Sequence, residues 1–452
     1  MIRQIKVDGF RTLSDFTLDL LPGLNILLGP NGGGKTTIIM FFSFINDIYS
    51  KNLSEAISTV GGAGHIFRKK GADDYQRTIS AEIRGTVNIK DIDYLPTRAR
   101  NLLSRGKFID YKYTFSIELS ADREDVYYNS QELVVRRSKR RTSSVGNIKK
   151  WDYKFSRTRT ADGTVISTAE SEHPDVNSIF DFTGYAPRGK NLASTLDQFL
   201  DPEDSLLHAA RFLGTDVHYS FAQNFGRRVL YNPQPESIRQ PEDSAKSPGI
   251  RPDGSGLYAS LLAIKRKKTR AIRAQRPINR DDIPFIRATP LERLEDYFRL
   301  AFPALFSIDV TNDPFDNQIR ARVTIDTAEG PQLPLASLSD GTLKWMSLAT
   351  ALITTRHVIG IEEPENFIHP NVQGHALQLI RESTREDSFV LVSSHSQSIM
   401  DAARPGEIVF VQLDGSKTRA SRIKDPEAIA DLINESGFGL SFFYMSGALQ
   451  DA

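Results

Sequence analysis

The sequence predicts an α/β fold in which a mixed sheet is combined with an antiparallel β subdomain and a helical insertion. Near its start, alternating apolar and polar residues at 2–8 and 14–20 precede an apolar run at 24–28 that leads into glycines. Residues 36–48 are mostly apolar and contain no glycine or proline. Alternation is typical of strands, and a long apolar stretch without breakers is typical of a packed helix. We therefore expect three strands followed by a helix.

A second set of alternating segments lies between about 76 and 170. Lys112–Leu119 and Glu132–Val135 both alternate, and Ala161–Thr164 has the composition of a hairpin turn. These features favour antiparallel strands joined by short turns. We expect an antiparallel β subdomain here.

Further along, the pattern changes to helices and then returns to strands. We expect helices at 257–270 and 290–300, and strands at 306–310 and 319–325 that return to the first sheet. The proline-rich stretch between them and the β subdomain, 232–249, is typical of a loop.

The composition limits the class of protein. With 452 residues, 39% hydrophobic and 25% charged, the chain can bury a large core and form two or three lobes. The absence of cysteine excludes disulfides, thiolate zinc sites and cysteine nucleophiles. No stretch has the length and apolarity of a signal or a membrane span, so we expect a cytoplasmic protein that does not contact a membrane. The formal net charge of +1 gives no general argument for nucleic-acid binding.

One segment matches the phosphate-binding pattern G-x-x-x-x-G-K-[ST], between a predicted strand and a predicted helix. Glycines let backbone N–H groups turn towards phosphate oxygens, the lysine reaches the terminal phosphates, and the threonine hydroxyl can ligate Mg²⁺. We expect ATP and Mg²⁺ to bind here. The candidate nucleotide-binding residues are Gly29, Pro30, Asn31, Gly32, Gly33, Gly34, Lys35, Thr36 and Thr37.

Two further apolar segments end in polar side chains. His357–Glu365 reads as a buried strand ending in carboxylates, and Phe389–His395 as a strand ending in hydroxyls and a histidine. Ligands of parallel sheets bind at the carboxyl ends of strands. We expect Glu362 to hold Mg²⁺ together with Thr36, and Glu363 to polarise the attacking water. His395 can sense the terminal phosphate.

With these residues identified, the chain resembles the ABC/RecF/OLD branch of P-loop ATPases, and especially the compact heads of anti-phage systems such as Septu and PARIS. Leu338–Trp345 looks like the family's signature, and Ser393–Ser396 like its switch histidine; Gly9–Thr12 and Gln131–Leu133 extend the likeness. The resemblance implies an ABC-type ATPase head. It also implies that Ser339 and Gly341 contact the γ-phosphate held by the opposite protomer, in a head-to-tail dimer or a larger homo-oligomer.

The expected organisation follows from these motifs. Residues 1–75 form the N-terminal part of the head with the Walker A loop, and 76–170 form the β subdomain. Residues 171–330 form the helical insertion and the strands that return to the head, and 331–452 carry the signature, the Walker B strand and the switch histidine.

Two features depart from the family pattern. Most P-loop ATPases have aspartate where this chain has Glu362, so hydrolysis need not be fast, and no Q-loop glutamine is assigned. The stretch after His395 has no obvious acidic metal cluster. We therefore expect a chain that does not cut nucleic acid by itself.

The resemblance leaves two roles open. In the first, the ATPase is a sensor and scaffold that controls a separate effector nuclease or toxin in response to nucleic acid or a phage-derived trigger. In the second, it is a RecF/SMC-like ATPase that binds DNA in repair. Two basic runs could neutralise phosphates, although a solvated surface is the more common role of such runs. They comprise Arg136, Arg137, Lys139, Arg140, Arg141, Lys149 and Lys150, and Lys265, Arg266, Lys267, Lys268 and Arg270. A transporter subunit is disfavoured by the long separation of Walker A from the signature.

Overall fold

A computed structural model gives the fold of most of the chain. It describes residues 1–71, 74–88, 108–122, 125–137, 152–171, 197, 200–211, 221, 224–225, 232–274, 290–313, 315–354, 360–366, 368–384 and 387–449. Much of the two basic runs lies outside the described part of the chain. This applies to the whole of Lys139, Arg140, Arg141, Lys149 and Lys150, and to the side chains of Arg137, Lys267, Lys268 and Arg270.

A five-stranded mixed sheet carries the phosphate-binding segment. Its strand order is β13-β14-β3-β15-β16, with the first four strands parallel and β16 antiparallel to β15. The strands are β3 (Gly23–Leu28), β13 (Gly360–Glu362), β14 (Phe389–Ser394), β15 (Ile408–Asp414) and β16 (Lys417–Arg422). Every residue of β14 is buried, as expected of a parallel strand covered on both faces. We call this the P-loop sheet.

A second, fully antiparallel sheet has seven strands in the order β2-β1-β4-β5-β6-β7-β8. The strands are β1 (Ile2–Asp8), β2 (Phe16–Asp19), β4 (Thr78–Asn88), β5 (Phe108–Leu119), β6 (Val126–Arg137), β7 (Asp152–Arg159) and β8 (Val165–Ser171). Burial alternates strictly along β5, so one face of the sheet packs and the other is more open. Because β1 and β2 belong to this sheet, the sheet contains residues from both sides of the domain boundary expected at residue 75.

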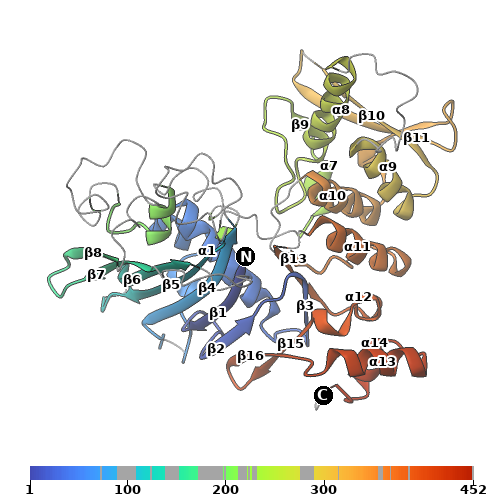
Figure 1. Cartoon of the computed structure of the whole chain (residues 1–452). Helices are drawn as coiled ribbons and strands as arrows, with labels where there is room; N and C mark the ends of the chain where they lie inside the picture. Colours follow the sequence, from blue (N-terminus) through green and yellow to red (C-terminus); the bar gives the residue numbers. More distant parts are fainter. Residues whose placement is uncertain are drawn as a thin grey trace, which may run out of the picture.

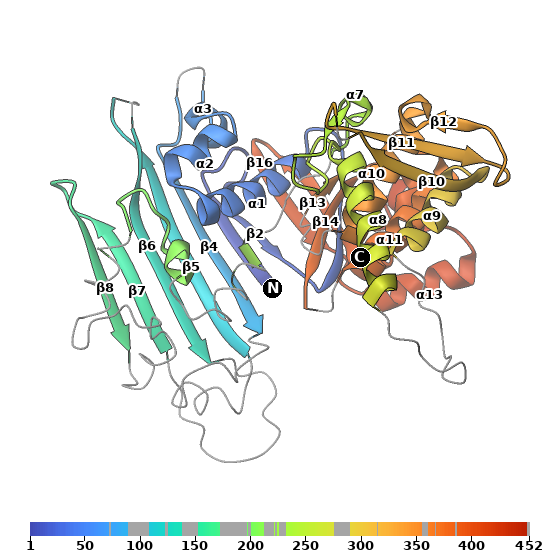
Figure 2. The ribbon, with the colours of Figure 1, turned by 90° about the horizontal axis from the view of Figure 1, so that it is seen from above.

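Helix α1 (Lys35–Ser50) lies between the two sheets (Figures 1 and 2). Together with α2 (Leu53–Thr59) and α3 (Ala63–Ile66), it covers one face of the seven-stranded sheet (Figure 2). Strand β3 divides the core: Leu27 packs into the apolar cluster on the α1 side, whereas Leu24, Ile26 and Leu28 pack into a second cluster beneath the other helices. The segment that leads into the P-loop is therefore held from both sides.

From residue 232 onwards, the described helices cover the other face of the P-loop sheet (Figure 1), whereas η2 packs against α1 and β6. Among the described residues, no helix is both long and apolar enough to cross a membrane. The α-helices are α7 (Pro235–Arg239), α8 (Leu257–Ala274), α9 (Pro290–Ala301), α10 (Asp340–Thr354), α11 (Pro370–Ser383), α12 (Gln397–Ala402), α13 (Pro426–Ser436) and α14 (Leu440–Met445), and the short 3₁₀ helices are η2 (Leu206–Arg211), η3 (Leu335–Ser337) and η4 (Pro405–Glu407).

The strands expected at 306–310 and 319–325 are present, but the expectation that they return to the P-loop sheet is wrong. They form a separate sheet of β10 (Leu305–Asn312), β11 (Gln318–Ile325) and β12 (Gln332–Pro334), with β9 (Glu242–Asp243) paired to β11. Burial alternates along β10 and most of β11, so these strands have one apolar face, which packs on α8 and α9. The central strands β3 and β14 of the P-loop sheet, in contrast, are buried on both faces.

A buried polar network joins the segment before η2 to the seven-stranded sheet. On β6, Gln131 accepts hydrogen bonds from the Tyr113 hydroxyl and the Leu206 N–H, both at 2.8 Å, and its amide nitrogen donates to the Asp204 carbonyl at 3.0 Å. Burial raises the pKa of Tyr113, which keeps its hydroxyl a protonated donor. Gln131, which resembles a family motif in the sequence, therefore has a structural position here.

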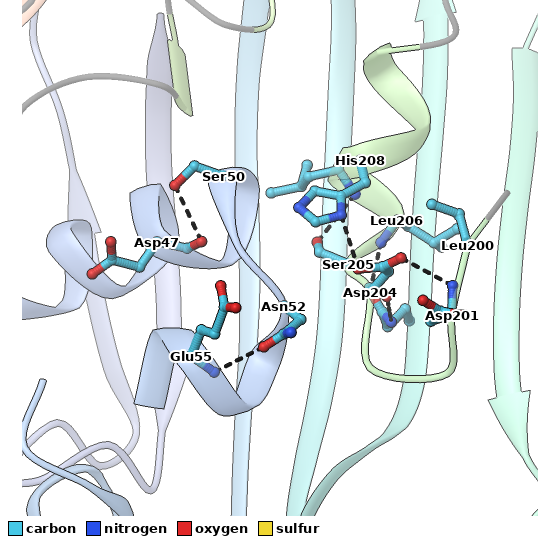
Figure 3. A network of polar contacts seen from close by, with 12 residues as sticks. Asp47, Ser50, Asn52, Glu55, Leu200, Asp201, Asp204, Ser205, Leu206 and His208 are labelled. Carbon is cyan, nitrogen blue, oxygen red and sulfur yellow. Dashed lines mark hydrogen bonds and ion pairs between the residues drawn. The ribbon is translucent and has the colours of Figure 1, made fainter. Parts of the chain in front are cut away.

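The same segment also reaches the helix that follows α1 (Figure 3). The side chain of Asp204 pairs with His208 at 3.2 Å, and Asn52 caps α2 by accepting from the Glu55 N–H (Figure 3). The Glu203 carbonyl accepts from the first residue of α2 at 3.1 Å. Sheet, network and α2 thus form one unit with the helix that begins at the P-loop.

We predict that Gln131→Leu lowers the free energy of unfolding by about 1–3 kcal/mol, because it leaves the Leu206 N–H buried without an acceptor, whereas the Asp204 carbonyl keeps its hydrogen bond from Arg157. The control is Glu132→Gln, the next residue on the opposite face of β6, whose half-exposed ion pairs with Lys112 and Lys154 contribute less than about 1 kcal/mol. Urea unfolding measures both, and equal costs would show that the network does not stabilise the fold.

Candidate nucleotide-binding site

The phosphate-binding segment turns sharply between the end of β3 at Leu28 and the start of α1 at Lys35. Gly29, Gly32 and Gly34 have φ values of 156°, 78° and 104°, all in the region that favours glycine. The backbone of the P-loop therefore requires glycine at three of its positions.

The C-terminal hairpin of β15 and β16 packs directly against this loop. A Cβ on Gly29 would lie 1.8 Å from the Val411 carbonyl oxygen, and one on Gly33 would lie 2.9 Å from it. A Cβ on Gly34 would lie 2.1 Å from Oγ1 of Thr418. The glycines thus permit a contact between backbones as well as an unusual turn. This contact could not be predicted from the sequence, because it joins segments from opposite ends of the chain.

Lys35 is 6% exposed, and its ammonium donates to the carbonyls of Gly29 at 2.7 Å and Pro30 at 3.0 Å. Burial lowers the pKa of Lys35, whereas the negative charges of Glu363 and Glu365 raise it. The P-loop lysine and the carboxylates after β13 therefore share one electrostatic environment, as expected for strand ends that meet at one edge of a parallel sheet.

Burial raises the pKa of Glu362, the last residue of β13; its side-chain interaction with Thr36 lowers the pKa, and the charge of Glu363 raises it further. Among the described residues, Oε1 of Glu362 is buried without a hydrogen-bond partner. A hydroxyl and an unpaired carboxylate oxygen are the hard ligands that Mg²⁺ prefers, so this pair fits a Mg²⁺ site completed by phosphate oxygens and water.

Glu363 occupies a strained turn immediately after β13. Its φ is 41°, which is uncommon for a residue other than glycine, and its N–H donates to the Ser393 carbonyl at 2.9 Å. Oε2 accepts from the Asn366 amide at 2.7 Å, and Nδ1 of His395 lies 3.5 Å from Oε1. Glu363 and His395, placed separately in the sequence analysis, therefore face each other.

Two charged residues at this site carry no assigned role in the sequence analysis. Glu365 is 7% exposed, and its Oε1 accepts from the Ser394 hydroxyl at 2.7 Å and the His395 N–H at 3.0 Å, which fixes the backbone of the histidine. Lys344, on α10, is 1% exposed; burial lowers its pKa, and Glu365 and Glu363 raise it. A buried lysine cannot be recognised from sequence, whereas Glu365 could have been noticed two positions after Glu363.

The signature residues lie on a different element from the P-loop. Ser339 precedes α10, and its exposed side chain contacts Thr342 as a helix cap, with the two hydroxyls 2.8 Å apart. Helix α10 packs against α7, α8, α9 and α11 and lies in the other half of the molecule from α1 (Figure 1). Among the described residues, neither Ser339 nor Gly341 has a hydrogen bond or ion pair to the P-loop. The chain brings together the P-loop, the acidic strand and His395, but not the signature.

Comparison with known families gives a match over most of the chain. Residues 24–401 match the family described as "AAA domain, putative AbiEii toxin, Type IV TA system". The range includes the P-loop, the signature, the acidic strand and His395. The predicted fold class, and the resemblance to ABC/RecF-like P-loop ATPases, are confirmed.

Individual relatives are more distant. The "DNA replication and repair protein RecF" of Rhodococcus erythropolis is 32% identical over 101 residues, which are 22% of this chain and 25% of that protein. This chain thus matches about a quarter of the length of that relative. Among solved structures, an SMC head bound to the C-winged helix domain of ScpA is 12% identical, with 93% of this chain and 97% of that chain covered and a TM-score of 0.47. The SMC head from Thermotoga maritima is 11% identical over 94% and 99% of the two chains, with a TM-score of 0.36.

We predict that Gly34→Ala weakens ATP binding at least about tenfold, because its Cβ would displace Thr418 and shift the loop from the hairpin. The control is Gly415→Ala, in the turn of the same hairpin: it has a φ of 59° and open space around the added carbon, so it places an alanine at positive φ without the clash. Titration with a fluorescent ATP analogue, alongside thermal unfolding, compares the two. Equal affinities would mean that the hairpin contact does not shape the site.

Proposed function

Because the chain belongs to this AAA-domain family and is an ABC/RecF-like P-loop ATPase, we propose that it binds and hydrolyses ATP with Mg²⁺ and that two heads close around the nucleotide. The observation that carries the proposal is the convergence of Lys35, Glu362, Glu363 and His395 at the ends of β3, β13 and β14. Residues from three strands that meet at one edge of a sheet form a site for a polyphosphate.

Each residue then has a defined task. The P-loop N–H groups and Lys35 bind the phosphates, and Thr36 and Glu362 hold Mg²⁺, whose chemistry is charge neutralisation at the phosphate oxygens. Glu363 accepts the proton of the attacking water, and Asn366 and the strained backbone fix the direction of its carboxylate. His395, whose Nδ1 lies 3.5 Å from Glu363, contacts the terminal phosphate. With glutamate at 362, slow turnover is compatible with the proposal.

We predict that Glu363→Gln keeps ATP bound while lowering the hydrolysis rate about a hundredfold or more, because an amide cannot accept the proton. Lys35→Ala, in contrast, removes the charge that faces the phosphates and should abolish binding itself. Single-turnover hydrolysis and equilibrium binding separate the two effects. A Glu363→Gln variant that hydrolyses ATP at the parental rate would move the base to another residue, with Glu362 the next candidate.

A composite site explains why the signature lies apart from the P-loop of its own chain. In the proposed head-to-tail dimer, the exposed Ser339 and the half-buried Gly341 of one protomer complete the phosphate site of its partner. Anion binding at the start of a helix is a general property of its free N–H groups and dipole, and α10 begins directly after Ser339.

We predict that mixing Lys35→Ala with Ser339→Arg restores part of the ATPase activity that each variant lacks alone. The first variant damages the phosphate cradle, and the second places an unpaired cation in the interface. In a mixed dimer, one site contains both the Lys35→Ala cradle and the Ser339→Arg signature. The other site contains the parental cradle and the parental signature. Tagged pull-down must first confirm that protomers exchange. A Ser339→Arg variant that is fully active as a monomer would rule out the composite site.

The biological role follows from the resemblance rather than from the site. We propose that the ATPase is a sensor and scaffold that controls a separate effector nuclease or toxin in anti-phage defence; the family's description names a putative toxin of a type IV TA system. A nucleic acid or a phage-derived molecule is the proposed trigger. A neighbouring gene that encodes a small nuclease or toxin would support this role.

The alternative role is direct DNA binding in repair, and the match to a RecF protein favours it. Of the basic side chains in these runs that the structure describes, Arg136 on β6 and Arg266 on α8 are exposed, whereas Lys265 pairs with Asp309 at 2.6 Å. Binding to labelled duplex DNA with and without ATP decides between the roles. DNA affinity that falls steeply with salt and depends on ATP would favour repair.

A further inference from the structure

The two C-terminal helices expose an unusual number of large apolar side chains. Leu432 on α13, Phe438 in the connection, and Phe442 and Met445 on α14 are 40%, 52%, 49% and 69% exposed. The rings of Phe438 and Phe442 stack with their centroids 4.3 Å apart, so they form one surface rather than two isolated positions. We call these four residues the C-terminal apolar face. Clustered exposed apolar side chains mark interaction surfaces in soluble proteins.

Acidic residues border this face. Glu427, Asp431 and Glu435 are exposed on α13 at intervals of four residues, which places them in one row along the helix beside Leu432. From Asp425 to Leu449 the sequence contains four acidic residues and no lysine, arginine or histidine. The surface therefore combines an apolar centre with a negative border.

The apolar face is exposed although its helices are firmly held. On α14, Leu440 and Phe443 are buried, and the ring of Tyr444 stacks on Phe410 of β15 with centroids 5.5 Å apart. The N–H of Ser441 donates to Asp401 of α12 at 2.8 Å. Fraying of the helices is therefore not the reason for the exposure.

Both residues that anchor α14, Phe410 and Asp401, lie on elements that contact the nucleotide site or begin beside it. Phe410 immediately precedes Val411, whose carbonyl packs against Gly29 and Gly33 of the P-loop. Asp401 belongs to α12, which begins directly after Ser396 and thus next to His395. In Figure 1, α13 and α14 lie on the side of the P-loop sheet away from the seven-stranded sheet. A partner bound to α13 and α14 would therefore be connected to the P-loop through β15 and to His395 through α12. It would not cover the nucleotide site.

We propose that the C-terminal apolar face is the docking site for a basic amphipathic segment of a separate protein. An amphipathic helix would place its apolar side chains against Phe438, Phe442 and Met445 and its lysines or arginines against the acidic row. A second copy of this chain offers a poorer match through the same face, because two acidic borders would then meet. The inference rests on the proposed function in one respect: it identifies where the controlled partner binds.

The test uses two labelled helical peptides of the same length, one built from leucine and lysine and the other from leucine and glutamate, with the full chain and without nucleotide. We expect the basic peptide to bind at least about tenfold more tightly than the acidic one, and its affinity to fall at least about tenfold in Phe442→Ser/Met445→Ser. The matched control is Phe315→Ser, which removes a ring that is 97% exposed outside the face; it should bind like the parent.

A charge reversal makes the test sharper. Asp431→Lys/Glu435→Lys should reverse the preference, so that the acidic peptide binds more tightly than the basic one. Equal binding of both peptides to the parent, or unchanged binding by the variants, would overturn the proposal. So would a parent that binds neither peptide but loses a self-assembled state in Phe442→Ser/Met445→Ser, since the face would then join two copies. Thermal unfolding checks that each variant is folded. Because no ATP is present, the result is independent of the outcome for Glu363→Gln.

Discussion

The nucleotide site depends on the close contact between the P-loop and the β15–β16 hairpin. Backbone can approach backbone this closely only where side chains are absent, and Gly29 and Gly33 leave no room for a Cβ beside the Val411 carbonyl. Strand β15 also pairs in parallel with β3, which leads into the loop. The conformation of the P-loop is therefore set from two directions, by the strand before it and by the hairpin behind it.

Charge balance is the second constraint on the site. Glu362, Glu363 and Glu365 lie within four residues, and Lys35 and Lys344 are almost completely buried near them. Buried charges are tolerated when opposite charges or hydrogen bonds compensate them. Glu363 and Glu365 raise the pKa of both lysines, and Glu365 also binds the Ser394 hydroxyl and the His395 N–H. Among the described residues, Glu362 and Glu365 each have one buried oxygen without a hydrogen-bond partner, and Glu362 is the one beside Thr36, which suits it to a metal ion.

The sequence predicted those parts of the fold and site that depend on local pattern. The P-loop could be found because its glycines, lysine and threonine are contiguous, and the strand ends around Glu363 and His395 because apolar runs stop there. The hairpin contact at Gly34 could not, since nothing near Gly34 in the chain indicates Thr418. The assignment of β10 and β11 to the P-loop sheet was wrong because an alternating pattern predicts a strand but not the strand with which it pairs. Their one apolar face indicated a sheet that is covered on one side. Lys344 looked like an ordinary helix residue because burial depends on the packing of α8–α11.

Lys344 also gives the proposed composite site a physical consequence. It is the fifth residue after Ser339 and lies on the helix that Ser339 caps, so the signature and the buried cation belong to one helix. In the proposed dimer, the start of α10 contacts the nucleotide of the partner, while Lys344 acts on Glu363 and Glu365 of its own chain. If α10 is displaced when the dimer closes around one nucleotide, the electrostatic field of Lys344 at Glu363 of its own chain changes. Glu363 of that chain is the proposed catalytic carboxylate of the second site. The two sites of a dimer would then be coupled through the charge of Lys344, without any contact between the two nucleotides.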